Sequence, residues 1–132
     1  MDKPKPFTTD QLPRPRGPYS QAVRAGGFLF VSGMAAIYPD SGQPCTGPVA
    51  EQVRVTLDNL KLLLHDAGGE LEQVVKTTVY LADMDEFQAM NEVYATYFPR
   101  NPPARTTIEA ARLPMDFLVE IDAVAWLGGD NE

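Results

Sequence analysis

Two charged side chains interrupt otherwise neutral segments near the end of the sequence. Arg105 lies in the small, neutral segment 103–107, and Glu120 lies in the apolar segment 117–121. A guanidinium group can bind a carboxylate through two parallel hydrogen bonds, so Arg105 could hold an anionic substrate. A carboxylate is costly to bury without a partner, and Glu120 could hold and orient a water molecule. A salt bridge or a solvated side chain is the alternative for each residue.

Few other residues could carry chemistry. Tyr19 follows a Gly-Pro pair, so a turn displays its ring, and either packing or contact with a ligand would explain it. His65 is the only histidine, and its place near the C-terminal end of a predicted helix suits an interaction with the helix dipole. Cys45 is the only cysteine, which excludes an internal disulfide and a cysteine-rich zinc site and favours a reducing compartment.

The composition places limits on the class of protein. The chain has 132 residues, 44% of them hydrophobic and 22% charged, with a net charge of −7, which suits one globular domain. The acidic balance disfavours nucleic acid as a partner but leaves a small anionic substrate open. No apolar run approaches the ~20 residues of a membrane helix, and the first residues lack the apolar stretch of a signal peptide. We therefore expect a cytoplasmic protein with a small-molecule partner.

The pattern of apolar residues predicts an α+β domain over 17–132, preceded by an arm over 1–16 with one short strand near 7–9. A hairpin turns at 26–27, and strands follow at 28–33, 74–81, 104–111 and 117–127. A helix is capped by Gly47 with Pro48 in its first turn, carries an apolar stripe over 49–67 and ends at 68–69. A second helix begins at the capping-box pair Asp83 and Glu86 and ends at Pro99.

The strand–helix–strand order indicates one sheet with both helices on the same face. Arg105 and Glu120 then lie on adjacent terminal strands. Nothing in a chain of this length is left to cover the other face of the sheet, although the last two strands carry apolar residues on both sides. We therefore expect that face to be buried against other copies of the chain.

Taken together, a set of short motifs resembles the RidA (YjgF) family. The resemblance runs from about residue 17 to residue 125 and rests on the order and spacing of the motifs. In chain order they are 17–22 (GPYSQA), 31–33 (VSG), 58–60 (DNL), 75–81 (VKTTVYL), 91–94 (NEVY) with Phe98, 103–106 (PART), 113–114 (LP) and 119–121 (VEI).

The resemblance implies a chorismate-mutase-like fold, in which one mixed six-stranded sheet carries two helices on one face and three chains form a homotrimer with clefts between subunits. It also implies hydrolytic deamination of 2-aminoacrylate-type enamines and 2-imino acids to 2-keto acids and ammonia. Such enzymes need no cofactor and no metal. Alternatives within the same resemblance are a deaminase for a 2-aminomuconate-type catabolic substrate, a metabolite-sensing trimer without catalysis, and an endoribonuclease.

Residue roles follow from the same resemblance. Arg105 matches the arginine that grips the substrate carboxylate, and Glu120 matches the glutamate that positions the attacking water. Thr107 stands where many members have cysteine, and its main-chain carbonyl is expected to help hold that water.

The remaining matched positions line the predicted pocket. Tyr19 belongs to the Gly-Pro-Tyr motif, and Ser32 and Gly33 are expected to shape the wall. Met34 stands where many deaminating members have glutamine, which makes this wall more apolar and bears on the identity of the substrate.

Overall fold

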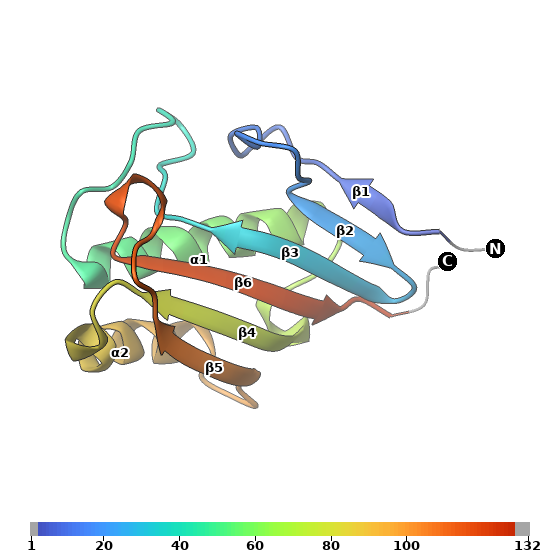
Figure 1. Cartoon of the computed structure of the whole chain (residues 1–132). Helices are drawn as coiled ribbons and strands as arrows, with labels where there is room; N and C mark the ends of the chain where they lie inside the picture. Colours follow the sequence, from blue (N-terminus) through green and yellow to red (C-terminus); the bar gives the residue numbers. More distant parts are fainter. Residues whose placement is uncertain (1–2, 129–132) are drawn as a thin grey trace.

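One six-stranded sheet and two α-helices form the structure, a computed structural model that describes residues 3–128 (Figure 1). Residues 1–2 of the predicted arm and 129–132 of the predicted domain lie outside the described residues. The helices are α1 (Val49–Asp66) and α2 (Phe87–Tyr97). The strands are β1 (Lys5–Phe7), β2 (Ala22–Ala25), β3 (Phe28–Met34), β4 (Val74–Leu81), β5 (Ala104–Glu109) and β6 (Val119–Trp126).

In the sheet the strands follow the order β1-β2-β3-β6-β4-β5. β4 and β5 are parallel and every other neighbouring pair is antiparallel, so the prediction of a mixed six-stranded α+β sheet is confirmed. The expected adjacency of the last two strands is wrong, because β4 lies between them. α2 carries the chain from β4 to a parallel neighbour at the edge, and β6 then runs back between β3 and β4, where it pairs on both sides.

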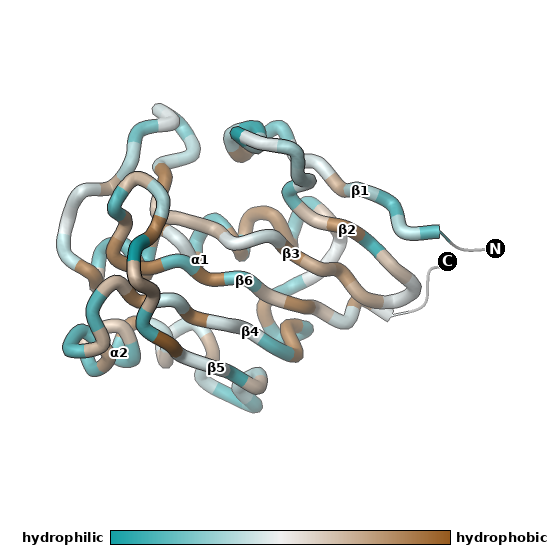
Figure 2. The backbone as a smooth tube through the Cα atoms, viewed as in Figure 1, coloured by the Kyte–Doolittle hydropathy of each residue, from teal (hydrophilic) through white to brown (hydrophobic). Residues whose placement is uncertain are grey.

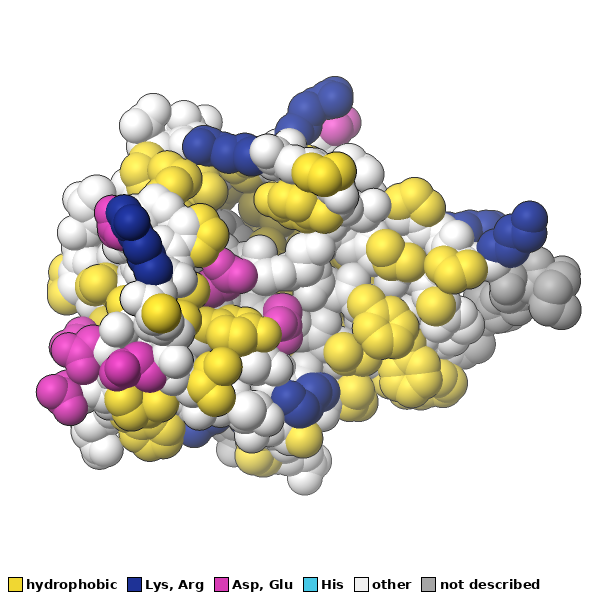
Figure 3. Space-filling model, in the orientation of Figure 1, with side chains coloured by type: hydrophobic (Ala, Val, Ile, Leu, Met, Phe, Trp, Pro, Cys, Tyr) yellow, Lys and Arg dark blue, Asp and Glu magenta, His cyan; other side chains and the backbone are white. Residues whose placement is uncertain are grey.

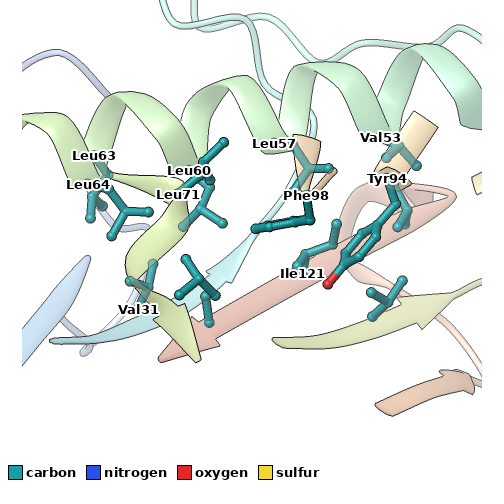
Figure 4. Close-up of a cluster of buried hydrophobic side chains, with 14 of the residues drawn as sticks. Val31, Val53, Leu57, Leu60, Leu63, Leu64, Leu71, Tyr94, Phe98 and Ile121 are labelled. Atoms are coloured by element: carbon teal, nitrogen blue, oxygen red, sulfur yellow. The ribbon is translucent and has the colours of Figure 1, made fainter. Parts of the chain in front are cut away.

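Both helices cover one face of the sheet, and the main core lies between α1 and the strands. Figure 4 shows this core in close-up, with leucines of α1 packed toward Val31 of β3 and Ile121 of β6. Leu57, Leu60 and Leu63 of α1 are at most 2% exposed. Each fully buried leucine stabilises the fold by about 1.5–3 kcal/mol, so this stripe supplies much of the driving force for folding.

Helix α1 begins one residue later than predicted and ends where predicted. The helix begins at Val49 and Pro48 is its cap residue, one position later than the predicted cap at Gly47. At the other end Gly68 has φ +88°, and the Gly69 N–H donates to the Leu64 carbonyl oxygen over 2.8 Å. This left-handed turn satisfies the last carbonyl groups and ends the helix as predicted.

The start of α2 differs from the predicted capping box. The Asp83 carboxylate accepts a hydrogen bond from the Asp85 N–H over 2.9 Å and thereby caps a short 3-10 turn over 84–86. Glu86 donates its own N–H to the Asp83 carbonyl oxygen, and α2 begins only at Phe87. Asp83 is thus a cap residue as predicted, but it caps the 3-10 turn over 84–86 and not the α-helix, so the predicted capping box with Glu86 is not formed at the start of α2.

The second face of the sheet is uncovered within one chain. Phe28 and Phe30 of β3 and Trp126 of β6 are 39%, 47% and 47% exposed, and the Phe28 and Trp126 rings lie 5.0 Å apart between centroids. Figure 2 shows hydrophobic residues along β3, and Figure 3 shows an apolar patch on this face beside acidic side chains. In the described part of the chain, no helix is long and apolar enough to cross a membrane.

Candidate active site

Glu120 occupies the uncovered face at the centre of the sheet. Its neighbours Val119 and Ile121 are 0% and 2% exposed on the helix-covered face, so the alternation of β6 points Glu120 the other way. The carboxylate is half-buried. Burial, followed by the negative charge of Asp122, raises the pKa of Glu120 above its ordinary value. A carboxylate with a raised pKa can exchange a proton nearer to neutral pH than an exposed glutamate can.

Gly33 leaves the space that the Glu120 carboxylate occupies. The register between β3 and β6 shifts between Val31 and Met34, and Gly33 lies at this irregularity. A Cβ atom at Gly33 would overlap Oε2 of Glu120, so only glycine leaves room for the carboxylate against the strand. The neighbouring Ser32 donates its hydroxyl to the Ser20 carbonyl oxygen over 2.6 Å and fixes the bulged strand to the chain before β2.

A pocket of about 130 Å³ opens beside Gly33. Its lining includes Tyr19, Ser32 and Gly33, and their role in binding a substrate stays a prediction. Tyr19 is 55% exposed, and its ring stands on a tight turn in which the Tyr19 N–H donates to the Gly17 carbonyl oxygen over 2.9 Å. In Figure 3 the surface is hollowed near the N-terminal segment, above the central strands. Glu120 and the pocket thus meet at Gly33.

The lining also contains two side chains that the sequence analysis does not single out, Arg14 and Arg16. They alternate with Pro13 and Pro15 directly before the Gly-Pro-Tyr turn. That alternation was the available signal, since prolines restrict the backbone and a basic residue beside a ligand-binding turn is a candidate contact.

Arg105 lies on the opposite face from Glu120. It pairs in register with Thr77, whose hydroxyl shares a 2.8 Å hydrogen bond with the hydroxyl of Tyr94 on α2. The guanidinium carbon lies 4.7 Å from the Tyr94 ring centroid and 5.5 Å from that of Phe87. Burial raises the pKa of Tyr94, and the positive charge of Arg105 partly offsets that rise. Arg105 is therefore held between aromatic rings at the edge of the sheet, not released into solvent.

Thr107 accompanies Arg105. It pairs with Val79, which is 0% exposed beneath the helices, so Thr107 also belongs to the helix side of β5. Because β5 is the edge strand, one side of its backbone has no strand partner among residues 3–128. The chain therefore carries Arg105 and Thr107 on one face of the sheet and Glu120 on the other, and the pocket beside Gly33 extends to Asn59 and Leu63 of α1.

Salt bridges do not account for the two central charges. Within residues 3–128 the ion pairs are Arg54 with Glu51 and Arg112 with Asp116. Neither Arg105 nor Glu120 takes part in them, so no ion pair among the described residues accounts for either charge.

The other candidates lie apart from this site. His65 is exposed on α1, and Cys45 is 2% exposed in a small second core. No group of three or more His, Cys, Asp or Glu side chains in the described ranges comes close enough together to hold a metal ion.

Comparison with known proteins identifies the family. The model of the family described as Endoribonuclease L-PSP matches residues 9–127. A RutC family protein of Pyrococcus horikoshii is 49% identical over 118 residues, covering 89% of this chain and 94% of that protein. The 2-iminobutanoate/2-iminopropanoate deaminase of Mus musculus is 44% identical over 124 residues, covering 94% of this chain and 92% of that protein.

A solved structure agrees. The YjgF gene product of E. coli superimposes with a TM-score of 0.87 at 37% identity, over 92% of this chain and 98% of that one. The chain therefore belongs to the YjgF/RidA family and has its fold.

Proposed function

We propose that this protein hydrolyses 2-imino acids, formed from 2-aminoacrylate-type enamines, to 2-keto acids and ammonia. The mouse relative named as such a deaminase supports this chemistry. The observation that carries the proposal is the half-buried Glu120 carboxylate against Gly33, a residue that also lines a pocket. The raised pKa of Glu120 suits proton exchange with a bound water.

In this proposal the active site is complete only when several copies of the chain assemble. Arg105 and Glu120 lie on opposite faces of one sheet, so a single chain does not present both to the same small molecule. The exposed Phe28, Phe30 and Trp126 form an apolar surface that a neighbouring copy would bury. In a homotrimer, Arg105 at the edge of one chain would then face Glu120 of the next, and the three clefts would be equivalent.

Arg105 binds and orients the substrate. Tyr94 and Phe87 contact the guanidinium carbon from their ring faces, which leaves the N–H donors in the plane of the group free for a carboxylate. Two parallel hydrogen bonds then fix the imino acid, so that the attack of water occurs on an oriented substrate.

Glu120 and the main-chain carbonyl of Thr107 hold the attacking water. Water forms a C–O bond with the C=N carbon, the π electrons move to nitrogen, and Glu120 takes the proton of the water. The protonated carboxyl returns this proton to nitrogen. Glu120 then takes the proton of the carbinolamine hydroxyl and passes it to the amino nitrogen, the C–N bond breaks as the C=O bond forms, and the products are a 2-keto acid and ammonia. Imines already hydrolyse in water, so positioning and proton transfer worth a few kcal/mol suffice.

A coupled assay tests the proposal. A serine or threonine dehydratase releases the enamine, and the purified protein should speed up the appearance of the keto acid. Arg105→Ala should abolish most of that acceleration, while Lys61→Ala on the exposed surface of α1 serves as the matched control. If the wild-type protein accelerates no small imino acid, the proposal is wrong and a sensing role takes its place.

The other functions have distinct signatures. An endoribonuclease would cleave RNA in a salt-sensitive manner that survives Arg105→Ala. A deaminase committed to a 2-aminomuconate-type substrate would act on that compound and leave the dehydratase products unchanged. The net charge of −7 and the exposed position of the only histidine weigh against the nuclease.

A further inference from the structure

The pocket beside Gly33 has a charge opposite to that of the protein. The chain carries a net charge of −7, yet the charged side chains that line this pocket are Arg14 and Arg16, and no acidic side chain lines it. The rest of the wall is largely apolar, with Leu12, Met34 and Ile37 among its members. An apolar pocket with positive charge at one side suits a ligand that has a short carbon chain and an anionic end.

The segment that carries the two arginines is tied down. Leu12 is 8% exposed and belongs to the main core. The Gln21 side chain donates to the carbonyl oxygens of Thr9 and Pro13 over 3.2 and 3.0 Å and accepts from the Thr9 N–H over 2.7 Å. With Pro13 and Pro15 also restricting the backbone, the two arginines extend from a fixed part of the chain. A fixed backbone lowers the entropic cost of using them to bind a ligand.

The described part of the chain does not neutralise these charges. Its ion pairs involve other arginines, Arg54 and Arg112. Arg16 donates from Nη1 to the Met115 sulfur over 3.6 Å, and this partner is weak and uncharged. Both guanidinium groups are exposed at the rim and are free to bind an anion.

We infer that the preferred substrates are imino acids with a second carboxylate on the side chain, such as those formed from acidic amino acids. The inference rests on the proposed function. With the first carboxylate on Arg105 and the C=N carbon at the water of Glu120, a side chain that passes Gly33 enters the pocket. A carboxylate at its far end then meets Arg14 and Arg16. Neutral side chains of the same length fill the apolar wall but leave both arginines without a partner.

The test compares acidic and neutral substrates. Amino-acid oxidases produce 2-imino acids from glutamate or aspartate and from alanine or leucine, and semicarbazide captures the imine that the protein has not yet hydrolysed. The readout is the ratio of kcat/KM for the acidic imine to kcat/KM for the neutral imine. In the double variant Arg14→Gln/Arg16→Gln this ratio should fall about tenfold, since two charge-assisted contacts at a partly exposed site are lost.

A matched variant and a charge reversal sharpen the test. Lys3→Gln/Lys5→Gln removes the same two charges from the arm outside the pocket, and the ratio should stay at the wild-type value. Arg14→Glu/Arg16→Glu should move the preference toward the imine of arginine, a gain that a purely structural role would not produce.

The outcomes separate the two levels of the proposal. If the wild-type protein hydrolyses neutral imines better than acidic ones and the double variant keeps the ratio, the inference is overturned while the proposed function stands. An equal loss on both substrates also overturns it, because the arginines would then act on folding or assembly. If the wild-type protein hydrolyses no imine at all, the proposed function itself fails.

Discussion

The placement of Arg105 and Glu120 on opposite faces makes a quantitative prediction about mixed oligomers. Arg105→Ala removes a charged hydrogen-bonding partner of the substrate, which should cost about 2–3 kcal/mol or roughly 30–150-fold in kcat/KM. Glu120→Gln keeps the shape of the side chain but removes the proton acceptor. Each variant alone should therefore be nearly inactive.

Mixing the two variants should restore part of the activity. A working cleft needs Arg105 from a chain that carries Glu120→Gln and Glu120 from its neighbour that carries Arg105→Ala. In a mixed homotrimer only one of the three clefts joins the two intact residues in the required order, so about one third of the clefts in the isolated mixed oligomers should work. Co-expression of differently tagged variants and two successive affinity steps isolate the mixed oligomers, and the dehydratase-coupled assay measures their activity.

The control is a mixture of two differently tagged Arg105→Ala chains, which has no working cleft and should stay inactive. Mixed oligomers of Arg105→Ala and Glu120→Gln that are no more active than this control would refute the assignment of the site to two chains. A light-scattering mass of a single chain for the wild-type protein would refute it as well.

Three further predictions concern the same site. The activity should fall at acidic pH with an apparent pKa above the ordinary glutamate value of about 4.3, because Glu120 must be ionised to accept a proton. Asp122→Asn removes the negative charge that helps to raise this pKa, so the acidic limb of the pH–rate profile should move to lower pH. An unmoved limb would contradict the role of Asp122. Gly33→Ala should lower kcat at least tenfold because its Cβ displaces the Glu120 carboxylate, while circular dichroism shows an intact fold; full activity would remove the argument from Gly33. Phe30→Asp should shift the mass toward single chains, since burying a phenylalanine is worth about 1.5–3 kcal/mol, and an unchanged mass would exclude this face from the interface.

Local patterns in the sequence account for most of the elements. The apolar stripe of α1 and the Gly68-Gly69 pair predict the helix to within one residue at its start, because 3.6-residue periodicity and left-handed glycine are local properties. Burial alternates along most of β4 and along β6 in the structure, as the pleat of a sheet requires. The extra turn before α2 was missed, since Asp83 caps a 3-10 turn and an α-helix with the same type of side chain.

The candidate residues of the proposed site could be chosen from the sequence, but their arrangement in space could not. Arg105 and Glu120 stand out in the sequence because a charge in a neutral strand needs an explanation. Their relative position depends on the strand order, and the insertion of β6 between β3 and β4 is a long-range pairing that no local propensity encodes. Arg14 and Arg16 were not singled out, because the hydrogen bonds of Gln21 that fix the segment carrying them join residues distant in sequence.

The sequence by itself thus determined the class of fold, the existence of its helices and strands and the family, since these follow from periodicity, turn residues and motif spacing. The tertiary structure alone decided that Glu120 rests against Gly33 on the uncovered face while Arg105 lies between aromatic rings on the other. The physical reason is that residues alternate between faces with a period of two, so the register of each strand pair selects the face on which a charge appears.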